Sequence, residues 1–353
     1  MRKIIHCDAD CFFVALEMRD DPDIRGIPVA VGGDPGKRGV ISTCNYEARA
    51  FGVGSAMASA YAKRLCPQLI ILPHNMNKYR EAAVEMRRLF MEYSDTIEPL
   101  SLDEAYLDVS ASHHCLGSAT LIAKDLRRRI KKEVGITVSA GVAGNKFLAK
   151  VASDWQKPDG LTVIEPSRTR FFLKHLPVSC IPGVGPASAK KLLSLGVSTC
   201  YDLQRLGEID LISKFGQFGE RLFQLSMGED TRPVQSRDYR KSLSVENTFD
   251  HDIHSLDKCY EHIPALFDKL SSRLNQLSRR QTIKTGFIKL TFFDFQKTTL
   301  ETGLSDPTVE QYKSLLEQVW RRYKKPVRLI GLGLRFKEIE EASDMQLALF
   351  NTA

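Results

Sequence analysis

The sequence has no apolar run of the roughly 18 residues that a membrane-spanning helix requires, so we expect no contact with a membrane. We also expect no secretion signal, because Asp8 and Asp10 interrupt the apolar stretch that such a signal needs. No two of the eight cysteines are separated by only two residues, which argues against a zinc site. Scattered cysteines without a pairing pattern are typical of a reduced, cytoplasmic protein, and this is the location we expect.

Positive charge is in modest excess and is unevenly distributed. The 353 residues are enough for several domains, and the formal net charge is +7. Most of this excess falls within residues 231–341. A local surplus of Lys and Arg indicates a surface for a polyanion, whereas an even distribution would only favour solubility.

The pattern of residues 1–165 predicts an α+β core. Residue 10 is the expected N-cap of the first helix. The alternation of strands and helices indicates a ferredoxin-like sheet, with residues 11–73 inserted after its first strand. The predicted strands are 1–10, 97–102, 105–110, 136–142 and 161–164, and the predicted helices are 11–19, 77–94, 117–133 and 146–155.

The second half of the sequence predicts a helical region and then another α/β region. Residues 166–230 are helical and punctuated by glycines, and the polar segment 231–242 resembles a linker. Strands are expected near 244–249 and at 283–293, 297–302 and 327–336, with helices at 256–278 and 307–323. The strand 283–293 alternates, with Ile288, Leu290 and Phe292 on one face and Lys289 and Thr291 on the other.

Three acids stand at the ends of apolar, strand-like runs. They are Asp8, at the end of the first strand, and the adjacent pair Asp103 and Glu104. Carboxylates brought together repel each other, and oxygen ligands without His or Cys suit Mg²⁺. Neighbours on a strand face opposite ways, so Asp103 and Glu104 could share an ion only at a hairpin tip. The alternative is a polar turn with Asp8 capping a helix. Asp108 is expected to face solvent at a strand end.

Residues 181–192 have the form of a helix-hairpin-helix. Gly183 and Gly185 permit a tight turn with exposed amides, and Pro186 suits the first position of the next helix. The free N–H groups of such a helix can hold a DNA phosphate without reading the base sequence. A tight turn without a ligand is the alternative. Residues 215–219 form a second, weaker candidate.

Five segments, in this order, resemble motifs of the Y-family translesion DNA polymerases, and the bacterial DinB type is the nearest match. They are 8–13 (DADCFF), 42–49 (STCNYEAR), 101–108 (SLDEAYLD), 141–146 (GVAGNK) and 152–160 (ASDWQKPDG). The resemblance covers nearly the whole chain and implies a right-hand polymerase with an α+β fold. The implied parts are a ferredoxin-like palm (1–10 and 74–165), fingers (11–73), a helical thumb (166–230), a linker (231–242), an α/β little finger (243–341) and a flexible tail (342–353).

The same resemblance assigns the site residues. It implies that Asp8, Asp103 and Glu104 hold two Mg²⁺ ions with help from the Ala9 carbonyl. It further implies an aromatic steric gate at Phe13 that excludes the 2′-hydroxyl of a ribonucleotide, with Phe12 or Phe13 as ordinary core residues the alternative. The residues implied to contact the incoming dNTP are Thr43, Tyr46, Arg49, Lys157 and Tyr79, each of which could otherwise be a solvated surface residue.

Two further contacts are expected in the second half. The little finger would follow the primer–template backbone through basic residues, each of which could equally be a solvated charge: Arg240, Lys241, Lys289 and Lys297. The segment 346–350 (QLALF) resembles the bacterial sliding-clamp-binding peptide. Its Gln346 would hydrogen-bond, and Leu347, Leu349 and Phe350 would fill an apolar pocket. A terminal strand packed on the protein body is the alternative.

Taken together, the sequence predicts a monomeric, template-directed DNA polymerase that copies damaged template with low fidelity. No separate exonuclease-like acidic cluster is apparent in the sequence, so we expect no proofreading. A metal-dependent nuclease or a nucleotide cyclase could use the same acids, although a sugar gate and a DNA-binding thumb argue against a cyclase. A non-catalytic DNA-binding scaffold recruited by the clamp is the third possibility, but a scaffold would have no use for the three acids.

Overall fold

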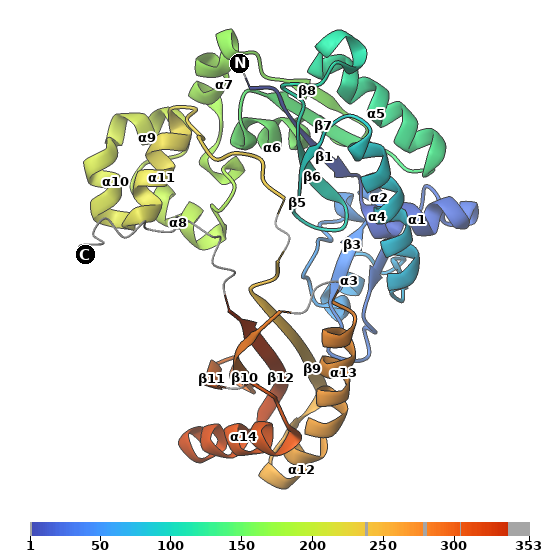
Figure 1. Cartoon of the computed structure of the whole chain (residues 1–353), viewed down its shortest axis with the longest axis vertical. Coiled ribbons are helices and arrows are strands. Elements are labelled where there is room, and N and C mark those ends of the chain that lie inside the picture. The colour runs from blue at the N-terminus through green and yellow to red at the C-terminus, as the bar shows by residue number, and fades with distance from the viewer. Residues whose placement is uncertain (1, 237–238, 278–280, 304, 338–353) are drawn as a thin grey trace, which may run out of the picture. The chain divides into compact units, whose positions relative to one another are not determined.

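The computed structural model describes residues 2–236, 239–277, 281–303 and 305–337. The chain divides into two compact units, the first of which ends at Ser236 (Figure 1). Each unit has its own buried apolar residues. No helix in these described ranges is long and apolar enough to cross a membrane. The predicted clamp-binding segment 346–350 lies outside the described residues.

The first unit is built on a five-stranded sheet, the central sheet, with the order β5-β6-β1-β7-β8. Strand β1 lies in the middle and runs antiparallel to β6 and β7, while β8 is parallel to β7. The strands β7-β1-β6-β5 have the ferredoxin-like order, which confirms the predicted fold, and β8 extends that sheet. The bounds are β1 Ile4–Ala9, β5 Thr96–Pro99, β6 Glu104–Asp108, β7 Val138–Ala143 and β8 Leu161–Val163.

Helices cover both faces of the central sheet, which is why β1 is almost entirely buried. Ile5 and Cys7 share a core with α4 and α5, whereas Ile4 packs with α6 on the opposite face. Helix α6 lies so close to β7 that a Cβ on Gly141 would come within 2.0 Å of the Ala149 carbonyl oxygen. The helices are α4 Met76–Met91, α5 Ala119–Glu133 and α6 Lys146–Trp155.

Between β1 and α4 the chain forms an insertion with a second, three-stranded sheet of order β3-β2-β4. Its small core is made mostly of short side chains, among them Ala30, Cys44 and Ala62. The elements are α1 Phe12–Asp20, β2 Val29–Gly32, β3 Ile41–Cys44, α2 Tyr46–Ala50, α3 Ser59–Leu65 and β4 Ile70–Leu72.

The predicted N-cap of α1 is wrong. Cys11 occupies that position, with φ of 42° and no side-chain cap bond. The Asp10 carboxylate instead accepts hydrogen bonds from the hydroxyls of Thr137 and Ser139, more than 120 positions away in the chain. A local pattern cannot reveal that distant donors replace the helix amides as partners.

A helical region completes the first unit, and its first hairpin begins as predicted. Gly183 has a φ of +99°, Gly185 is the N-cap of α8, and Pro186 is its first residue. Gly216, with φ of +61°, separates α10 from α11 in a second tight turn. The helices are α7 Thr169–His175, α8 Pro186–Ser194, α9 Cys200–Leu206, α10 Glu208–Phe215 and α11 Gln217–Ser226.

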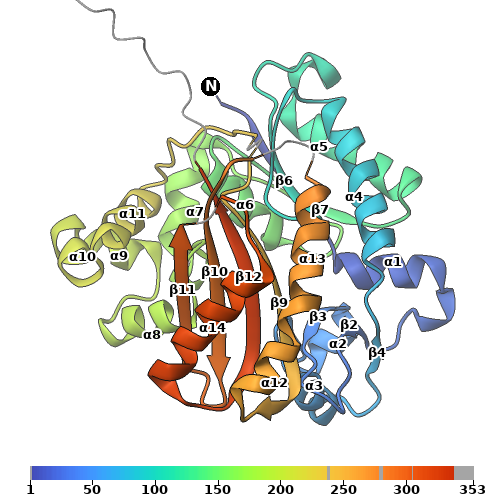
Figure 2. The ribbon, with the colours of Figure 1, turned by 60° about the horizontal axis from the view of Figure 1, so that its bottom comes forward.

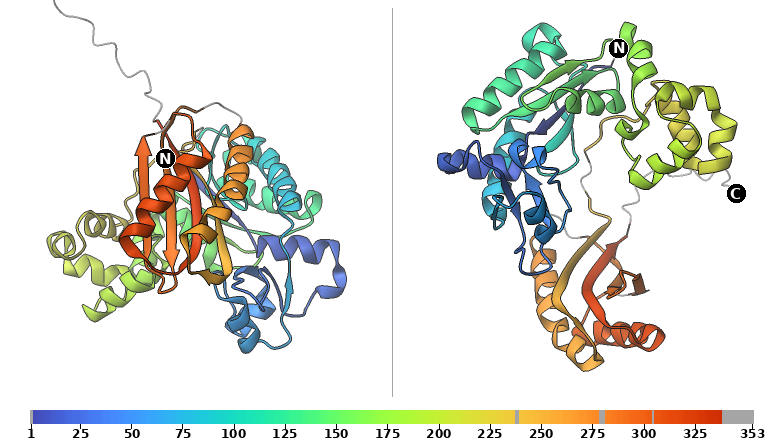
Figure 3. Two further views of the ribbon diagram at one scale, coloured as in Figure 1. Left: turned by 90° about the horizontal axis from the view of Figure 1, so that it is seen from below. Right: turned by 180° about the vertical axis from the view of Figure 1, so that it is seen from behind.

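The second unit contains a four-stranded antiparallel sheet, the C-terminal sheet, of order β11-β10-β12-β9. Its helices lie against one face (Figures 2 and 3). The predicted helix 256–278 is two helices, because Pro264 occupies the first turn of α13. The bounds are β9 Ser242–Ile253, α12 Leu256–Glu261, α13 Ile263–Asn275, β10 Ile283–Phe292, β11 Lys297–Gly303, α14 Val309–Tyr323 and β12 Val327–Phe336.

Candidate active site

Two of the three predicted acids lie directly opposite each other in the central sheet. Asp8 on β1 is the register partner of Glu104 on β6, so their side chains leave the same face of the sheet. One ligand atom from each, together with one from His6, lie within 4.8 Å of one another. Strand register therefore joins acids that are 96 positions apart in the sequence.

Asp103 occupies the turn just before β6 and lines a cavity together with Asp8, but it is not part of the close cluster of His6, Asp8 and Glu104. Its carbonyl oxygen accepts a hydrogen bond of 3.0 Å from the Ala9 amide, which ties the turn to the end of β1. Its carboxylate accepts one from the Ser101 hydroxyl. Asp8 therefore shares a cavity with Asp103 and a ligand cluster with Glu104.

Lysine side chains neutralise both paired acids. The Lys157 ammonium lies 2.8 Å from Asp8 and 3.0 Å from Asp154, and Lys150 contacts Glu104. Burial raises the pKa of Asp8 to about 6, against the opposing effect of Lys157. Burial also acts to raise the pKa of Glu104, but His6 and Lys150 outweigh it and lower the pKa to about 2. Glu104 is consequently ionised at neutral pH, whereas burial keeps Asp8 easier to protonate.

His6 is a site residue that the sequence reasoning missed. It is fully buried, and its Nδ1 lies 2.7 Å from Ser153 Oγ, which itself donates to the Lys150 carbonyl. Its Nε2 lies 3.2 Å from a Glu104 oxygen without hydrogen-bond geometry. Burial lowers the pKa of His6 despite the neighbouring carboxylate. The available signal was its position two residues before Asp8, on the same face of β1.

A cavity of about 320 Å³ gathers most of the residues predicted to bind the metal ions or the nucleotide, but Glu104, Tyr46 and Tyr79 are not among its lining residues. Arg49 and Lys157 line it from distant parts of the chain, one from the insertion and one from the segment after α6. The hydroxyl-bearing Ser42 and Ser55 were not predicted. The full lining is Asp8, Ala9, Cys11, Phe12, Phe13, Ser42, Thr43, Arg49, Ser55, Asp103 and Lys157.

The two adjacent phenylalanines have different surroundings. Phe12 is 2% exposed and belongs to the core, whereas Phe13 is only partly buried. The Phe13 ring stacks on Tyr79, with the ring centroids 4.2 Å apart and the planes 12° from parallel. Tyr79 is itself fully buried, does not line the cavity, and donates a hydrogen bond of 2.7 Å to Glu17. Tyr79 therefore supports Phe13 from behind.

Tyr46 lies beside this cavity and lines a neighbouring one together with Asp10. The Arg49 guanidinium carbon is 4.6 Å from the Tyr46 ring centroid, a cation–π distance. The Tyr46 hydroxyl lies 3.4 Å from an Asp10 carboxylate oxygen. Burial and the nearby Asp10 raise the pKa of Tyr46, so its hydroxyl remains a donor at neutral pH.

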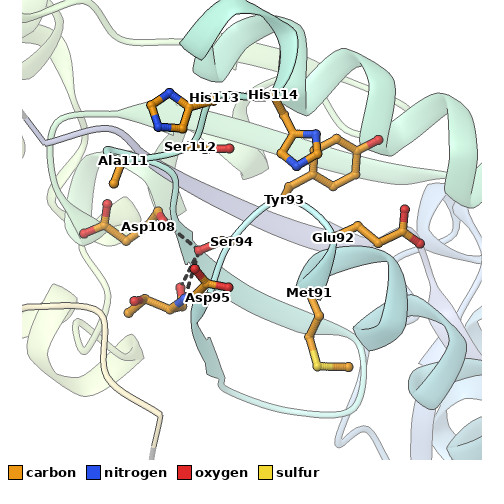
Figure 4. A pocket seen from close by; sticks show the side chains of 11 residues that line it. Met91, Glu92, Tyr93, Ser94, Asp95, Asp108, Ala111, Ser112, His113 and His114 are labelled. Carbon is orange, nitrogen blue, oxygen red and sulfur yellow. Dashed lines mark hydrogen bonds between the residues drawn. The ribbon is translucent and has the colours of Figure 1, made fainter.

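Asp108 ends β6 far along the strand from the three acids. Its carboxylate accepts a hydrogen bond of 3.0 Å from the Ser110 amide. It lines a separate cavity of about 270 Å³ with Ser94, Asp95, His113 and His114 (Figure 4). Among the residues that the structure describes, only His6, Asp8 and Glu104 form a cluster of three potential metal ligands. The residues of this second cavity do not form such a cluster.

The predicted DNA contacts lie in the helical region and on the C-terminal sheet. Gly183 and Gly185 form the turn before α8, as described above. Lys289 projects from the face of β10 opposite the helices and pairs with Glu246 at 2.8 Å, and Lys297 at the start of β11 is exposed. Arg240 and Lys241 precede that sheet, and both are exposed.

The donors at the acidic site fit a hard divalent cation. Asp8, Asp103 and Glu104 supply carboxylate oxygens, which suit Mg²⁺. Among the described residues, the close cluster of potential ligands contains Asp8 and Glu104 together with the imidazole of His6, a nitrogen donor better suited to transition metals, and does not include Asp103. Carboxylates that hold divalent metal ions, next to basic side chains that can bind phosphate, are typical of enzymes that catalyse phosphoryl or nucleotidyl transfer.

Three family models match successive parts of the chain. The impB/mucB/samB family model matches residues 7–154, and the C-terminal domain model of that family matches residues 240–349. Between them, residues 179–230 match a model described as the thumb domain of DNA polymerase-iota. The chain thus belongs to the impB/mucB/samB family and is a Y-family DNA polymerase, an enzyme class that carries out template-directed translesion synthesis.

The similar proteins narrow this class to the DinB type. The chain is 51% identical over 350 residues to DNA polymerase IV of Pseudomonas entomophila, covering 99% of each, and 51% identical to that of Pseudomonas syringae pv. tomato with the same coverage. A solved Y-family polymerase chimera of Dbh and Dpo4 has a TM-score of 0.86 at 26% identity, covering 94% of this chain and 98% of its own. The insertion ternary complex of Dbh DNA polymerase has a TM-score of 0.68 at 26% identity, with 96% and 99% covered.

Proposed function

We propose that this polymerase adds dNTPs to a primer 3′ end by two-Mg²⁺ nucleotidyl transfer at Asp8, Asp103 and Glu104. The observation that carries the proposal is the register pairing of Asp8 with Glu104. Asp103 lines the same cavity as Asp8, which two cationic side chains also enter. The carboxylates that would bind the metal ions and the basic side chains that would bind phosphates therefore line one cavity, where a single nucleotide could contact both.

The carboxylates would hold the ions, with the Ala9 carbonyl as a further oxygen ligand. Bound Mg²⁺ would lower the pKa of the primer 3′-hydroxyl and offset charge on the triphosphate and the departing pyrophosphate. Lys150 keeps Glu104 ionised, and the turn that carries Asp103 is fixed through the Ala9 amide.

The incoming triphosphate would be bound by Arg49, Lys157, Thr43 and Tyr46. Arg49 offers a planar fork of donors for phosphate oxygens, and Lys157 a point charge. Lys157 already lies between Asp8 and Asp154, so its ammonium needs only a small movement to reach a phosphate near those acids. Thr43 lines the cavity and would add a hydroxyl donor.

Phe13 would act as the steric gate against ribonucleotides. Its ring lines the cavity beside Asp8 and is held by the stacked Tyr79. A ring fixed in this way cannot move aside cheaply, so a 2′-hydroxyl would meet a rigid surface. The role of Tyr79 would then be to support the gate, close to the nucleotide but not in contact with it.

Primer–template DNA would be held without sequence readout by the remaining parts. The palm (1–10 and 74–165) and fingers (11–73) would form the active site. The thumb (166–230) would use the amides at Gly183 and Gly185, and the little finger (243–341) would use Lys289 and Lys297. Backbone amides and lysines at phosphates give salt-dependent, sequence-independent affinity.

Primer extension separates this function from the alternatives. With Mg²⁺ and dNTPs we expect template-directed extension. Strand cleavage would indicate a nuclease, a cyclic nucleotide a cyclase, and DNA binding without turnover a scaffold. Asp103→Asn should lower the rate by about 10³-fold, on the order of 4 kcal/mol of transition-state stabilisation. Asp108→Asn, at the other end of β6, is the matched control and should retain the wild-type rate; near-normal extension by Asp103→Asn would exclude the proposed site.

Recruitment by the sliding clamp is a separate part of the proposal, as are monomeric state, a cytoplasmic location and the lack of proofreading. Deleting residues 346–353 should leave distributive synthesis unchanged and remove the stimulation by the clamp, because the tail supplies Gln346, Leu347, Leu349 and Phe350 to its pocket. Synthesis with and without clamp on the same primer measures the effect. Full stimulation of the truncated chain would rule out this role for the tail.

A further inference from the structure

Asp10 is a buried carboxylate that the proposed chemistry does not use. It is 2% exposed and lies in the link between β1 and α1. A buried carboxylate is costly unless it is well hydrogen-bonded, and Asp10 accepts from four neutral groups. One oxygen accepts from Ser139 Oγ at 2.8 Å and Tyr46 Oη at 3.4 Å, and the other from Thr137 Oγ1 and the Asp159 amide, both at 2.8 Å.

The four donors come from three parts of the first unit. Ser139 lies in β7 and Thr137 directly precedes that strand, so both belong to the central sheet. Tyr46 begins α2 in the insertion, and Asp159 lies in the loop between α6 and β8. The last two belong to separate elements beside the cavity, so Asp10 bonds to both of these elements as well as to the central sheet.

The bond to Asp159 fixes the loop that carries Lys157. Asp159 has a φ of +49°, and its own carboxylate is held by Arg127 at 2.7 Å and Lys131 at 2.9 Å. Its amide, which donates to Asp10, lies two residues after Lys157. The Lys157 ammonium in turn lies 2.8 Å from Asp8. The Asp10 side chain and the Lys157 ammonium therefore fix the same short loop at two points.

The bond to Tyr46 acts on the other side of the cavity. The Tyr46 ring lies under the Arg49 guanidinium, whose Nε donates to the Cys44 carbonyl at 3.3 Å. Moving the Tyr46 hydroxyl would thus move the surface on which Arg49 rests. Asp10 bonds to both the insertion and the Lys157 loop, and so connects the two sides of the cavity.

We propose that Asp10 is the positioning residue that holds Tyr46 and the Lys157 loop at a fixed separation for one nucleotide triphosphate. This inference rests on the proposed function, in which Tyr46, Arg49 and Lys157 bind the phosphates. Asp10 touches neither substrate nor ion in this account. It sets the geometry of groups that do, so its loss affects nucleotide binding more than the chemical step.

The first test is Asp10→Asn, studied by single-turnover incorporation of one dNTP on a primer–template. The amide keeps the shape of the side chain but replaces one acceptor oxygen by a donor, so it cannot accept all four hydrogen bonds. We expect the apparent Kd for dNTP to rise about tenfold, or about 1.4 kcal/mol, with the maximal rate changed less than threefold. A wild-type Kd in a folded Asp10→Asn protein would overturn the proposal.

A double-mutant cycle shows whether Asp10 acts through Tyr46. Tyr46→Phe removes the hydroxyl that reaches Asp10, and the combined variant should bind dNTP about as weakly as the weaker single variant. Multiplicative effects on Kd would contradict the positioning role. If Asp10→Asn does not fold, Thr137→Val replaces it in the same cycle, with an expected threefold rise in Kd. A wild-type Kd for Thr137→Val would then count against the proposal.

Two controls separate this inference from its neighbours. Asp230→Asn changes another buried, hydrogen-bonded carboxylate, which does not line the cavity. The Asp230 carboxylate accepts a hydrogen bond of 3.0 Å from the Phe147 amide. It should lower the melting temperature but leave the Kd unchanged. A Kd shift equal to that of Asp10→Asn would reduce Asp10 to a structural residue. Arg49→Ala tests the proposed function itself, because an unchanged Kd for dNTP in this variant would refute the phosphate site. If Arg49→Ala raises the Kd but Asp10→Asn leaves it at the wild-type value, only the inference about Asp10 is refuted.

Discussion

The central sheet and the C-terminal sheet place their charged side chains in opposite ways. The central sheet is covered by helices on both faces, so its acids Asp8 and Glu104 are largely shielded from solvent and are held by lysines. The C-terminal sheet has helices on one face only, and Lys289 on the other pairs with Glu246 across the exposed surface. A buried charge is held in one position, and removing its partner costs much stability. An exposed ion pair contributes little stability and its side chains can move.

This difference matches what each sheet would have to do. A reaction centre needs carboxylates fixed to within a fraction of an ångström, which the register of β1 and β6 provides for Asp8 and Glu104. A surface that follows a moving duplex needs many weak contacts that exchange easily. Changes in the two sheets should therefore differ in size, in salt dependence and in pH dependence.

After the loss of turnover expected for Asp103→Asn, the next largest effect is expected at Phe13, on α1 beside the acids. Phe13→Val should admit ribonucleotides, with the preference for dNTP over rNTP falling about a hundredfold, or about 2.7 kcal/mol of discrimination. The reason is that a shorter side chain leaves room at the sugar C2′. Competing incorporation of matched dNTP and rNTP measures the ratio, and Phe12→Val is the core control. Unchanged sugar preference in Phe13→Val would remove the gate assignment.

A smaller effect is expected on stability at Asp230, also in the first unit. Burial acts to raise the pKa of this carboxyl, but Arg232 and the Phe147 amide outweigh it and lower the pKa. Because the folded-state pKa is below its ordinary value, the carboxylate stabilises the fold above about pH 4, and this contribution is lost as pH falls through the folded-state pKa. Asp230→Asn should therefore cost about 2 kcal/mol at pH 7 and less at low pH.

Denaturant unfolding at several pH values measures this cost. The matched change in the C-terminal unit is Glu246→Gln, which breaks an exposed pair and should cost less than about 1 kcal/mol. Equal costs for the two variants would remove the contrast between buried and exposed charge.

The smallest effect is expected on DNA affinity. Replacing Lys289 and Lys297 by Ala should weaken primer–template binding only severalfold at moderate salt. It should also reduce the slope of log affinity against log salt by roughly 0.9 for each phosphate that the protein no longer neutralises. Binding to a labelled duplex at several salt concentrations checks both. A weakening that depends on base sequence, or a slope identical to wild type, would show that these lysines do not meet phosphates.

The fold was largely predictable because its patterns are local. Helix α6 has the predicted bounds, and the buried alternation of Ile288, Leu290 and Phe292 is visible in the sequence. Where prediction failed, a single residue or a distant partner decided the structure. Pro264 divides one expected helix into α12 and α13, and the Asp10 carboxylate bonds across the sheet instead of capping α1.

The candidate site was predictable in part for the same reason. Asp8, Asp103 and Glu104 stand out because acids at the ends of apolar runs are unusual. Among their supporting residues, His6 could have been found from its position two residues before Asp8 on β1. Lys150 and Ser42 have no local signature and reach the site only through the packing of α6 and β3.

Cation binding at the three acids is the central claim, and it can be measured without turnover. We would titrate Mn²⁺, followed by electron paramagnetic resonance, into the chain with dideoxy-terminated primer–template and matched dNTP. The account predicts two bound ions per wild-type complex and at least one fewer in Asp8→Asn, Asp103→Asn and Glu104→Gln, with two retained in Asp108→Asn. Wild-type stoichiometry and affinity in all three acid variants would contradict it.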